Sequence, residues 1–482
     1  MLPNELLNEI LEELSPSELK NIVLASRHLW LLARPFLFSK LCMEPYAYDE
    51  DISNHMDDPD DDVCHPLVLP SADRIAAFVA KLGFFLSPAI APHVRVLHII
   101  AGEQTSNCVE FDEDPGTNVH ELCDLLFSAV DRFVNLRKFV AHGIMFTVPA
   151  LARLARLRGP LELKLSAFSF YSALGDAWVD SVRALDLHIP VSALHIGDLE
   201  EEAHLWLTLY VCDPEVLQKV HWRVNTPITG LDALVHMYST VLPHVHSLEL
   251  QVPSMTVLSR TGWSNLQQTL PGLQVLGIRS LEEYYHNEDE PLELEFLATQ
   301  TALAYLRELD TNSLSSADIL CAAPTIDTLR LERRYLPPDG VLSRLKNMSA
   351  HGTITTLALE LCDGDHPTWA GILAHFPHLQ TLEWTVSLQG ARWQEVPVFL
   401  SELPAILPPS LKRLTVSYSQ PCLYGSEPEE EEMAFPEDNQ ASLPEASELR
   451  TRLLERCPGL ESISLQAQSW RVEWRQLTGI FR

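Results

Sequence analysis

A short arrangement of apolar and variable positions recurs along most of the chain, from about residue 92 onward. An apolar residue is followed by two variable positions, a second apolar residue, one variable position and a third apolar residue, as in Val94-x-x-Leu97-x-Ile99. Such alternation is typical of a short strand with one buried face. The second apolar residue of each predicted strand is Leu97, Phe139, Leu163, Leu185, Val220, Leu248, Leu276, Leu309, Leu329, Leu357, Leu382, Leu414 and Ile463.

The segments between these copies predict helices and turns. Apolar spacings of three and four upstream of several copies predict helices within residues 75–82, 122–133, 317–321 and 369–376. Neither a helix nor a strand of this size can bury its apolar side alone, so neighbouring repeats are expected to stack into a curved solenoid with a continuous core. Proline cannot continue a helix, and it marks the start of an extended segment in seven copies, at Pro92, Pro243, Pro271, Pro324, Pro377, Pro409 and Pro458.

The first forty residues follow a different pattern. Apolar residues spaced by three and four predict a helix over residues 3–14. The run Ser15-Pro16-Ser17-Glu18 supplies a new helix N-terminus, and a third helical segment is expected to stop at Pro35. Three helices of this length hide too little surface to bury all their apolar residues, so part of that surface must meet something else.

This N-terminal segment resembles an F-box, in the form common in fungal proteins. The resemblance covers residues 2–41 and lies in the Leu2-Pro3 start, the Ser15-Pro16 turn and the Leu32-Ala33-Arg34-Pro35 ending. It implies docking on a Skp-type adaptor, which ties the protein to a cullin ubiquitin ligase. The alternative is a three-helix cap that only closes the end of the repeats. The positions to which the resemblance assigns the adaptor contact are Leu2, Pro3, Leu6, Ile10, Leu11, Leu14, Pro16, Leu19 and Arg27.

The repeats resemble the irregular leucine-rich repeats that follow F-boxes, since most copies are spaced at or near 20–29 residues. The alternative is an ordinary α/β domain, but the chain has only 19 glycines and no G-x-G-x-x-G motif. The expected fold is therefore α/β, with a short three-helix F-box followed by a leucine-rich-repeat-like solenoid with a parallel sheet. We expect an F-box at 1–41, an acidic linker at 42–70 and the solenoid at 71–482, with acidic insertions near 198–202, 282–295 and 425–445.

Charge is concentrated in a few places. The chain has 34 Lys and Arg against 66 Asp and Glu, a formal net charge of −32, which disfavours a nucleic-acid partner. Twenty-six of the acidic residues lie in four segments without Lys or Arg, which are 49–62, 198–202, 282–295 and 427–438. These segments are either solvated loops or a negative rim that attracts a partner protein with basic character.

Signs of catalysis or metal binding are weak. The chain has no P-loop, H-E-x-x-H or G-x-S-x-G motif, and no cofactor is expected. His244-x-His246, Asp363-x-Asp365-His366 and the run 57–62 lack a convincing further ligand, so no metal is expected. Nine scattered cysteines without a C-x-x-C pair, and no long apolar stretch, indicate an intracellular protein, cytoplasmic or nuclear.

Large aromatic residues in or just after the predicted strands are candidates for substrate contacts. Trp384, Trp470 and Trp474 are the chosen candidates, although aromatic residues at such positions more often fill the core. The sequence thus predicts a non-catalytic substrate receptor of a Skp-cullin-F-box ubiquitin ligase. The first alternative is a leucine-rich-repeat scaffold or inhibitor that delivers no substrate, and a second is a hydrolase with its site in an insertion.

Overall fold

The computed structural model describes part of the chain. These residues are 3–48, 67–101, 119–170, 187–199, 208–224, 241–252, 268–280, 305–312, 325–332, 342, 352–362, 366–387, 396–419, 445–467 and 470–475. They form two compact units, one made of Met1–Pro253 and Val257–Gly272, the other of Ser254–Thr256 and Leu273–Arg482. None of the described helices is long and apolar enough to cross a membrane.

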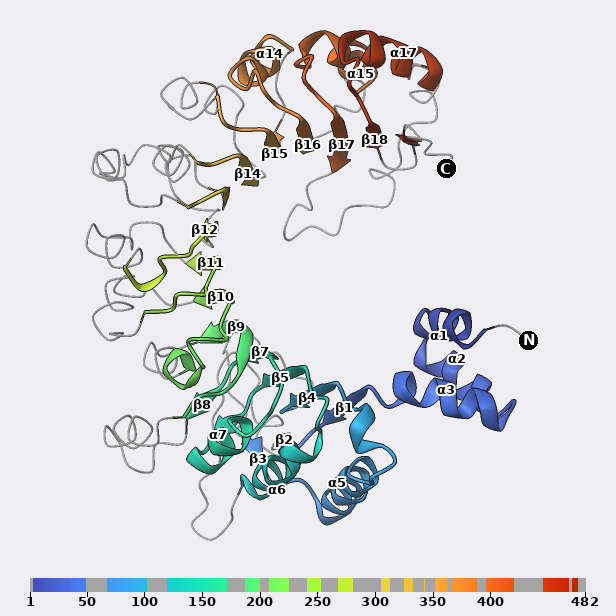
Figure 1. The fold of residues 1–482 in the computed structure, drawn as a ribbon, viewed down its shortest axis with the longest axis vertical. Helices are drawn as coiled ribbons and strands as arrows, with labels where there is room; N and C mark the ends of the chain where they lie inside the picture. Colours follow the sequence, from blue (N-terminus) through green and yellow to red (C-terminus); the bar gives the residue numbers. More distant parts are fainter. Residues whose placement is uncertain are drawn as a thin grey trace, which may run out of the picture. The chain divides into compact units, whose positions relative to one another are not determined.

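The first unit begins with three helices and continues as a parallel sheet with helices on one side (Figure 1). The sheet has the order β1-β4-β5-β7-β9-β10-β11, and every neighbouring pair is parallel. Its helices are α1 (Asn4–Glu12), α2 (Pro16–Val23), α3 (Arg27–Leu37), α5 (Ala72–Phe85), η1 (Ala91–His93), α6 (Glu121–Ala129), η2 (Val130–Arg132) and α7 (Val148–Leu154). The strands of the sheet are β1 (Lys40–Met43), β4 (Val96–Ile100), β5 (Lys138–His142), β7 (Leu161–Ser166), β9 (Val191–Leu199), β10 (Lys219–Val224) and β11 (Ser247–Val252).

Two short strand pairs flank this sheet. The antiparallel pair is β2 (Ala47–Tyr48) with β3 (Leu67–Val68), and the parallel pair is β6 (Met145–Phe146) with β8 (Ser169–Phe170).

The second unit repeats the same construction. Its sheet has the order β12-β13-β14-β15-β16-β17-β18-β19, parallel except for the last pair, and α14, α15 and α17 lie on one side of it (Figure 1). The strands are β12 (Val275–Ser280), β13 (Glu308–Thr311), β14 (Thr328–Glu332), β15 (Thr356–Cys362), β16 (Thr381–Ser387), β17 (Arg413–Ser419), β18 (Ser462–Ala467) and β19 (Trp470–Arg475). The helices are α14 (His366–Ala374), α15 (Val396–Ile406) and α17 (Ala446–Arg456).

The strand register confirms the repeat pattern at twelve of the thirteen predicted positions. In the first unit the second apolar residues align as Leu97, Phe139 and Leu163, and then Val220 and Leu248, each buried. In the second unit the aligned and buried ladder is Leu276, Leu309, Leu329, Leu357, Leu382, Leu414 and Ile463. The architecture is that of a leucine-rich-repeat-like solenoid in each unit.

One predicted copy lies largely outside the described residues, and several observed strands were not predicted. Between β7 and β10 the sheet contains β9, where Leu194 pairs with Leu163 and Val220. The predicted copy around Leu185 lies largely outside the described residues, and Leu194 belongs to a second match to the same pattern, Val191-x-x-Leu194-x-Ile196. Strand β1 was not predicted either: its Leu41 pairs with Leu97, so part of the expected 42–70 linker belongs to the sheet. The short strands β2, β3, β6 and β8 and the last strand, β19, were likewise not predicted.

The turns before the strands hold neighbouring repeats together. Two successive backbone N–H groups at the start of a strand donate to one carbonyl oxygen of the preceding repeat, as Thr355 and Thr356 do to Asp327 at 2.8 and 3.0 Å. Pro377, Pro409 and Pro458 lie in turns between a helix and the next strand, as predicted. These turns leave the first strand residue aligned with its neighbour, and the whole ladder of buried residues follows from that alignment.

Candidate partner-binding surfaces

The N-terminal helices form a small head whose sequence specifies its helix starts. The Ser15 and Glu18 side chains cap α2 reciprocally, because Glu18 N–H donates to Ser15 Oγ at 3.4 Å and Ser15 N–H donates to Glu18 Oε2 at 2.8 Å. Ser26 Oγ accepts from Leu29 N–H at the start of α3. The expected stop at Pro35 was wrong: α3 continues to Leu37, because a proline in the last turn removes only one backbone hydrogen bond.

The head divides the predicted adaptor positions into two groups. Leu11 and Leu19 are buried with Ala33 at the centre of the three helices, and Leu14 packs partly buried against them. Leu6 and Ile10 lie on another face of α1 and are 44% and 49% exposed. Leu11 and Leu19 therefore hold the head together, while Leu6 and Ile10 are available to a partner.

The other four predicted adaptor positions are either exposed or outside the described residues. Pro3 and Arg27 are exposed, Leu2 lies outside the described residues, and the side chain of Pro16 is likewise outside them. The sequence analysis missed two exposed apolar residues, Leu24 at 85% and Leu31 at 50% exposure. Leu24 follows the last residue of α2, where the three-and-four spacing does not tell a core residue from a surface one.

An aromatic cluster attaches the head to the first repeat. Phe38, directly after α3, contacts Trp30 of the head with ring centroids 5.9 Å apart. The same ring contacts Phe84 and Phe85 of α5 at 5.6 and 6.0 Å. Edge-to-face packing of this kind fixes ring orientation as well as distance. The head is therefore packed against the repeats of its own unit.

The open side of the first sheet, which faces away from its helices, carries an unusual set of side chains. Along each strand the buried residues alternate with half-buried or exposed ones, so the latter share one face. We call the basic residues of this side the cationic face. They are Lys40, His98, Lys138, His142, Lys164, His195, Lys219, His221 and Arg223, on six neighbouring strands from β1 to β10.

The electrostatics of this side centre on Glu162. Its Oε1 lies 2.9 Å from Lys138 Nζ, 3.4 Å from Lys164 Nζ and 3.7 Å from His195 Nε2. Burial alone would raise the pKa of the Glu162 carboxyl, but hydrogen bonds and charge from the two lysines lower it below its ordinary value. Glu162 is therefore a fixed negative charge shared by the two lysines.

Histidines extend the same surface. His221 Nδ1 lies 2.6 Å from Glu249 Oε2, and the rings of His195 and His221 have centroids 5.5 Å apart. Burial, then repulsion from Lys164 and His221, lowers the pKa of His195. Burial, then Lys40 and His142, lowers the pKa of His98. These two imidazoles are neutral at pH 7 and can both donate and accept hydrogen bonds.

On the open side of the second sheet, two arginines are paired with carboxylates of neighbouring strands. Arg330 donates to Glu308 at 2.9 Å and to Glu383 at 3.0 Å, bridging β13, β14 and β16. Arg279 of β12 donates to Asp310 of β13 at 2.8 Å. Arg330 and Arg279 are thus engaged by carboxylates of the same sheet, whereas Arg413, the exposed first residue of β17, forms no ion pair with any residue that the structure describes.

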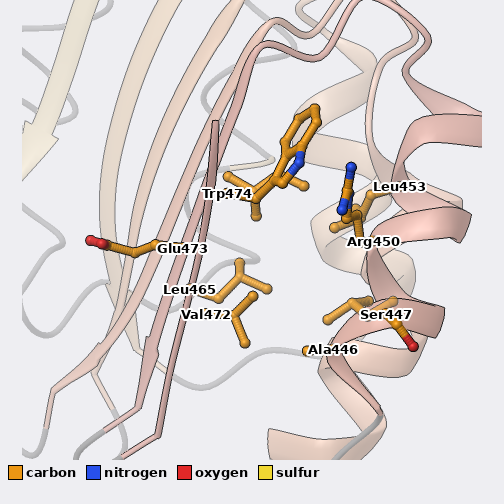
Figure 2. Close-up of a pocket in the computed structure, with 10 residues that line it drawn as sticks. Ala446, Ser447, Arg450, Leu453, Leu465, Val472, Glu473 and Trp474 are labelled. Atoms are coloured by element: carbon orange, nitrogen blue, oxygen red, sulfur yellow. The ribbon is translucent and has the colours of Figure 1, made fainter. Parts of the chain in front are cut away.

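The aromatic candidates fall into separate environments. Trp384 is 1% exposed and packs against Trp369 of α14 with ring centroids 4.5 Å apart, so it fills the core and cannot touch a substrate in this state. Trp474 lies in β19 and lines a cavity of about 200 Å³ between α17 and the last two strands (Figure 2). The guanidinium of Arg450 lies 4.5 Å from its ring centre. The side chain of Trp470 is outside the described residues.

The metal candidates stay without support. His244 lies 3.2 Å from Glu215 on an exposed surface. Within the described part of the chain, no three His, Cys, Asp or Glu side chains gather in a way that would hold a metal ion. Asp363-x-Asp365 and the acidic segments 49–62, 282–295 and 427–438 lie outside the described residues, as does most of 198–202. The prediction of a negative rim and a basic partner therefore stays a prediction.

Comparison with known proteins gives distant likenesses only. No family model and no curated protein matches the chain. A chain of the Rad7 and Elc1 complex in yeast aligns with a TM-score of 0.38 and 13% identity over 88% of this chain and 89% of that one. The leucine-rich repeat-containing protein LegL7 from Legionella pneumophila aligns with a TM-score of 0.32 and 16% identity over 64% of this chain and 92% of that one.

Proposed function

We propose that the protein is a substrate receptor of a cullin ubiquitin ligase, acting in the cytoplasm or nucleus. The head docks on a Skp-type adaptor, and the repeats hold a protein substrate. The observation that carries the proposal is the exposure of Leu6 and Ile10 on one face of α1, in a head whose own core is already formed by Leu11 and Leu19. Exposed apolar side chains held on a preformed helix face suit docking into a partner's hydrophobic groove.

The receptor performs no bond chemistry in this proposal. It raises the effective concentration of the substrate near a ubiquitin-charged enzyme held elsewhere in the complex. The cation–π pair of Trp474 and Arg450, beside the cavity under α17, offers a second contact point for a substrate. The alternative, a scaffold or inhibitor, uses the same surfaces but leads to no ubiquitin transfer.

The test is binding of the purified full chain to a purified Skp-type adaptor. Burying Leu6 and Ile10 at an interface contributes about 1.5–3 kcal/mol per side chain, so Leu6→Asp with Ile10→Asp should weaken binding at least tenfold. Val79→Asp is the matched control, because Val79 lies on α5 with 46% exposure, close to that of Ile10. We expect the control to bind within about twofold of wild type, since surface substitutions away from a site have small effects.

Two results would count against the proposal. The first is failure of the wild-type chain to bind the adaptor, and the second is equal binding by the double variant, with thermal midpoints unchanged in both. The scaffold alternative is separated by a reconstituted ubiquitination assay on proteins that co-purify with the chain. If the chain is a receptor, the co-purifying proteins are ubiquitinated only when Leu6 and Ile10 are intact. If it is a scaffold, they are ubiquitinated neither with the wild-type chain nor with the double variant.

A further inference from the structure

The cationic face of the first unit is opposite in sign to the net charge of the whole chain. The chain carries −32, yet among the side chains that the structure describes on the open side of this sheet five are Lys or Arg and four are His, against two carboxylates, Glu162 and Glu249. Solvated surfaces of so acidic a chain should on average be negative. A concentration of basic groups on one side of one sheet is therefore a local feature of these strands.

The two carboxylates do not neutralise this surface. Glu162 is shared by Lys138, Lys164 and His195, and Glu249 is engaged by His221. Lys40 and Lys219 form no ion pair with any residue that the structure describes. The surface keeps positive charge that an added anionic group would stabilise, in contrast to the matched pairs of Arg330 and Arg279 in the second unit.

The shape of the surface limits the kind of occupant. The basic residues lie on six parallel strands, and adjacent strands are about 4.8 Å apart, so the cationic face spans roughly 24 Å. An extended chain advances about 3.4 Å per residue, so roughly seven residues cross the face. The half-buried neutral imidazoles of His98 and His195 lie among the lysines and can hydrogen-bond carboxylates.

We propose that the cationic face binds an acidic segment of a partner protein, extended across strands β1 to β10. Nucleic acid fits less well, because the rows of open-side residues on these strands include no Phe, Tyr or Trp on which a base would stack. The inference goes beyond the proposed function, since it needs no adaptor; if that function holds, the segment belongs to the substrate.

The experiment measures binding of a short fluorescent glutamate-rich peptide to the purified full chain by anisotropy. The test variant carries Lys40→Glu, Lys164→Glu and Lys219→Glu. The matched control carries Lys81→Glu, Arg156→Glu and Arg158→Glu, which change the net charge equally at exposed positions of the same unit but lie off the sheet. A set with Lys→Gln at the three test positions removes the charges without adding new ones, and thermal unfolding checks that every variant is folded.

We expect the wild-type chain and the control to bind the peptide within about twofold of each other, more weakly at about 0.5 M salt than at 0.05 M. The affinity of the glutamate variant for the peptide should fall at least about tenfold. The affinity of the glutamine variant should fall less, because exposed ion pairs are individually weak. Equal losses in test and control variants, or no binding by the wild type, would overturn the proposal. So would tighter binding of a single-stranded oligonucleotide of equal charge.

The chain's own acidic segment 49–62 is the competing occupant. Neutralising its eight carboxylates, by Asp→Asn and Glu→Gln, tests this. Peptide binding that appears only in the neutralised chain would show that the face serves an internal segment and would overturn the proposal. Adaptor binding is measured separately on the same variants, so a failure here and a failure of the proposed function are distinguishable.

Discussion

Replacing Leu194 by alanine tests the register of β9, a strand that the sequence analysis did not predict. Leu194 is fully buried in β9 and pairs with Leu163 on one side and Val220 on the other. The competing arrangement puts Leu185 at this place in the ladder. The same substitution at the two positions therefore separates the two registers.

The magnitude follows from burial. Leu→Ala removes three carbon groups, each contributing about 0.8 kcal/mol when buried, and the remaining cavity adds to the loss. We expect Leu194→Ala to lower the free energy of unfolding by about 3 kcal/mol. For a unit of this size each kcal/mol corresponds to about 2–4 °C, so the thermal midpoint should fall by roughly 6–12 °C.

The assay is thermal unfolding followed by circular dichroism, with hydrogen exchange to locate the change. Because the chain has two units, exchange at the amides of β9 and its neighbours is needed to assign the transition to the first unit. The register would be refuted if Leu194→Ala left stability within about 0.5 kcal/mol of wild type while Leu185→Ala caused the large loss.

Two further predictions concern titrating groups. Burial, with repulsion from Lys164 and His221, lowers the pKa of His195 in the folded chain. As the pH falls, the unfolded chain therefore protonates His195 at a higher pH than the folded chain does. Stability measured in urea should therefore fall as the pH drops below about 6.5, and His195→Gln should reduce that dependence; equal slopes would contradict it. Burial raises the pKa of the Cys123 thiol to about 12, so iodoacetamide at about pH 8 should label the half-buried Cys42 long before Cys123, as mass spectrometry would show. Equal labelling rates would mean that α6 does not pack on the sheet as described.

The buried ladder could be predicted because the repeat constrains it strongly. A residue such as Leu357 must be apolar in a fixed relation to its neighbours, and a one-residue slip would turn it to solvent. The ambiguity between Leu185 and Leu194 has the same origin. Two matches to the pattern lie close together there, and only pairing with both neighbouring strands selects Leu194.

The head shows the limit of spacing as a guide to surfaces. Leu6 and Leu11 are both apolar and helical, but one is exposed and the other buried, because α3 covers only one side of α1. Trp384 illustrates the same limit in the repeats. An aromatic residue on a strand is a candidate contact from sequence, and only the packing of α14 places it in the core.

The sequence alone determined the repeat architecture, the helical head and the overall negative charge, because each depends on local periodicity or composition. Only the tertiary structure decided which side chains share a surface. Lys40 and Lys219 are nearly 180 residues apart, and the variable positions they occupy carry no pattern of their own. Parallel stacking of the strands places these positions on one open side, and that side is basic in an acidic protein.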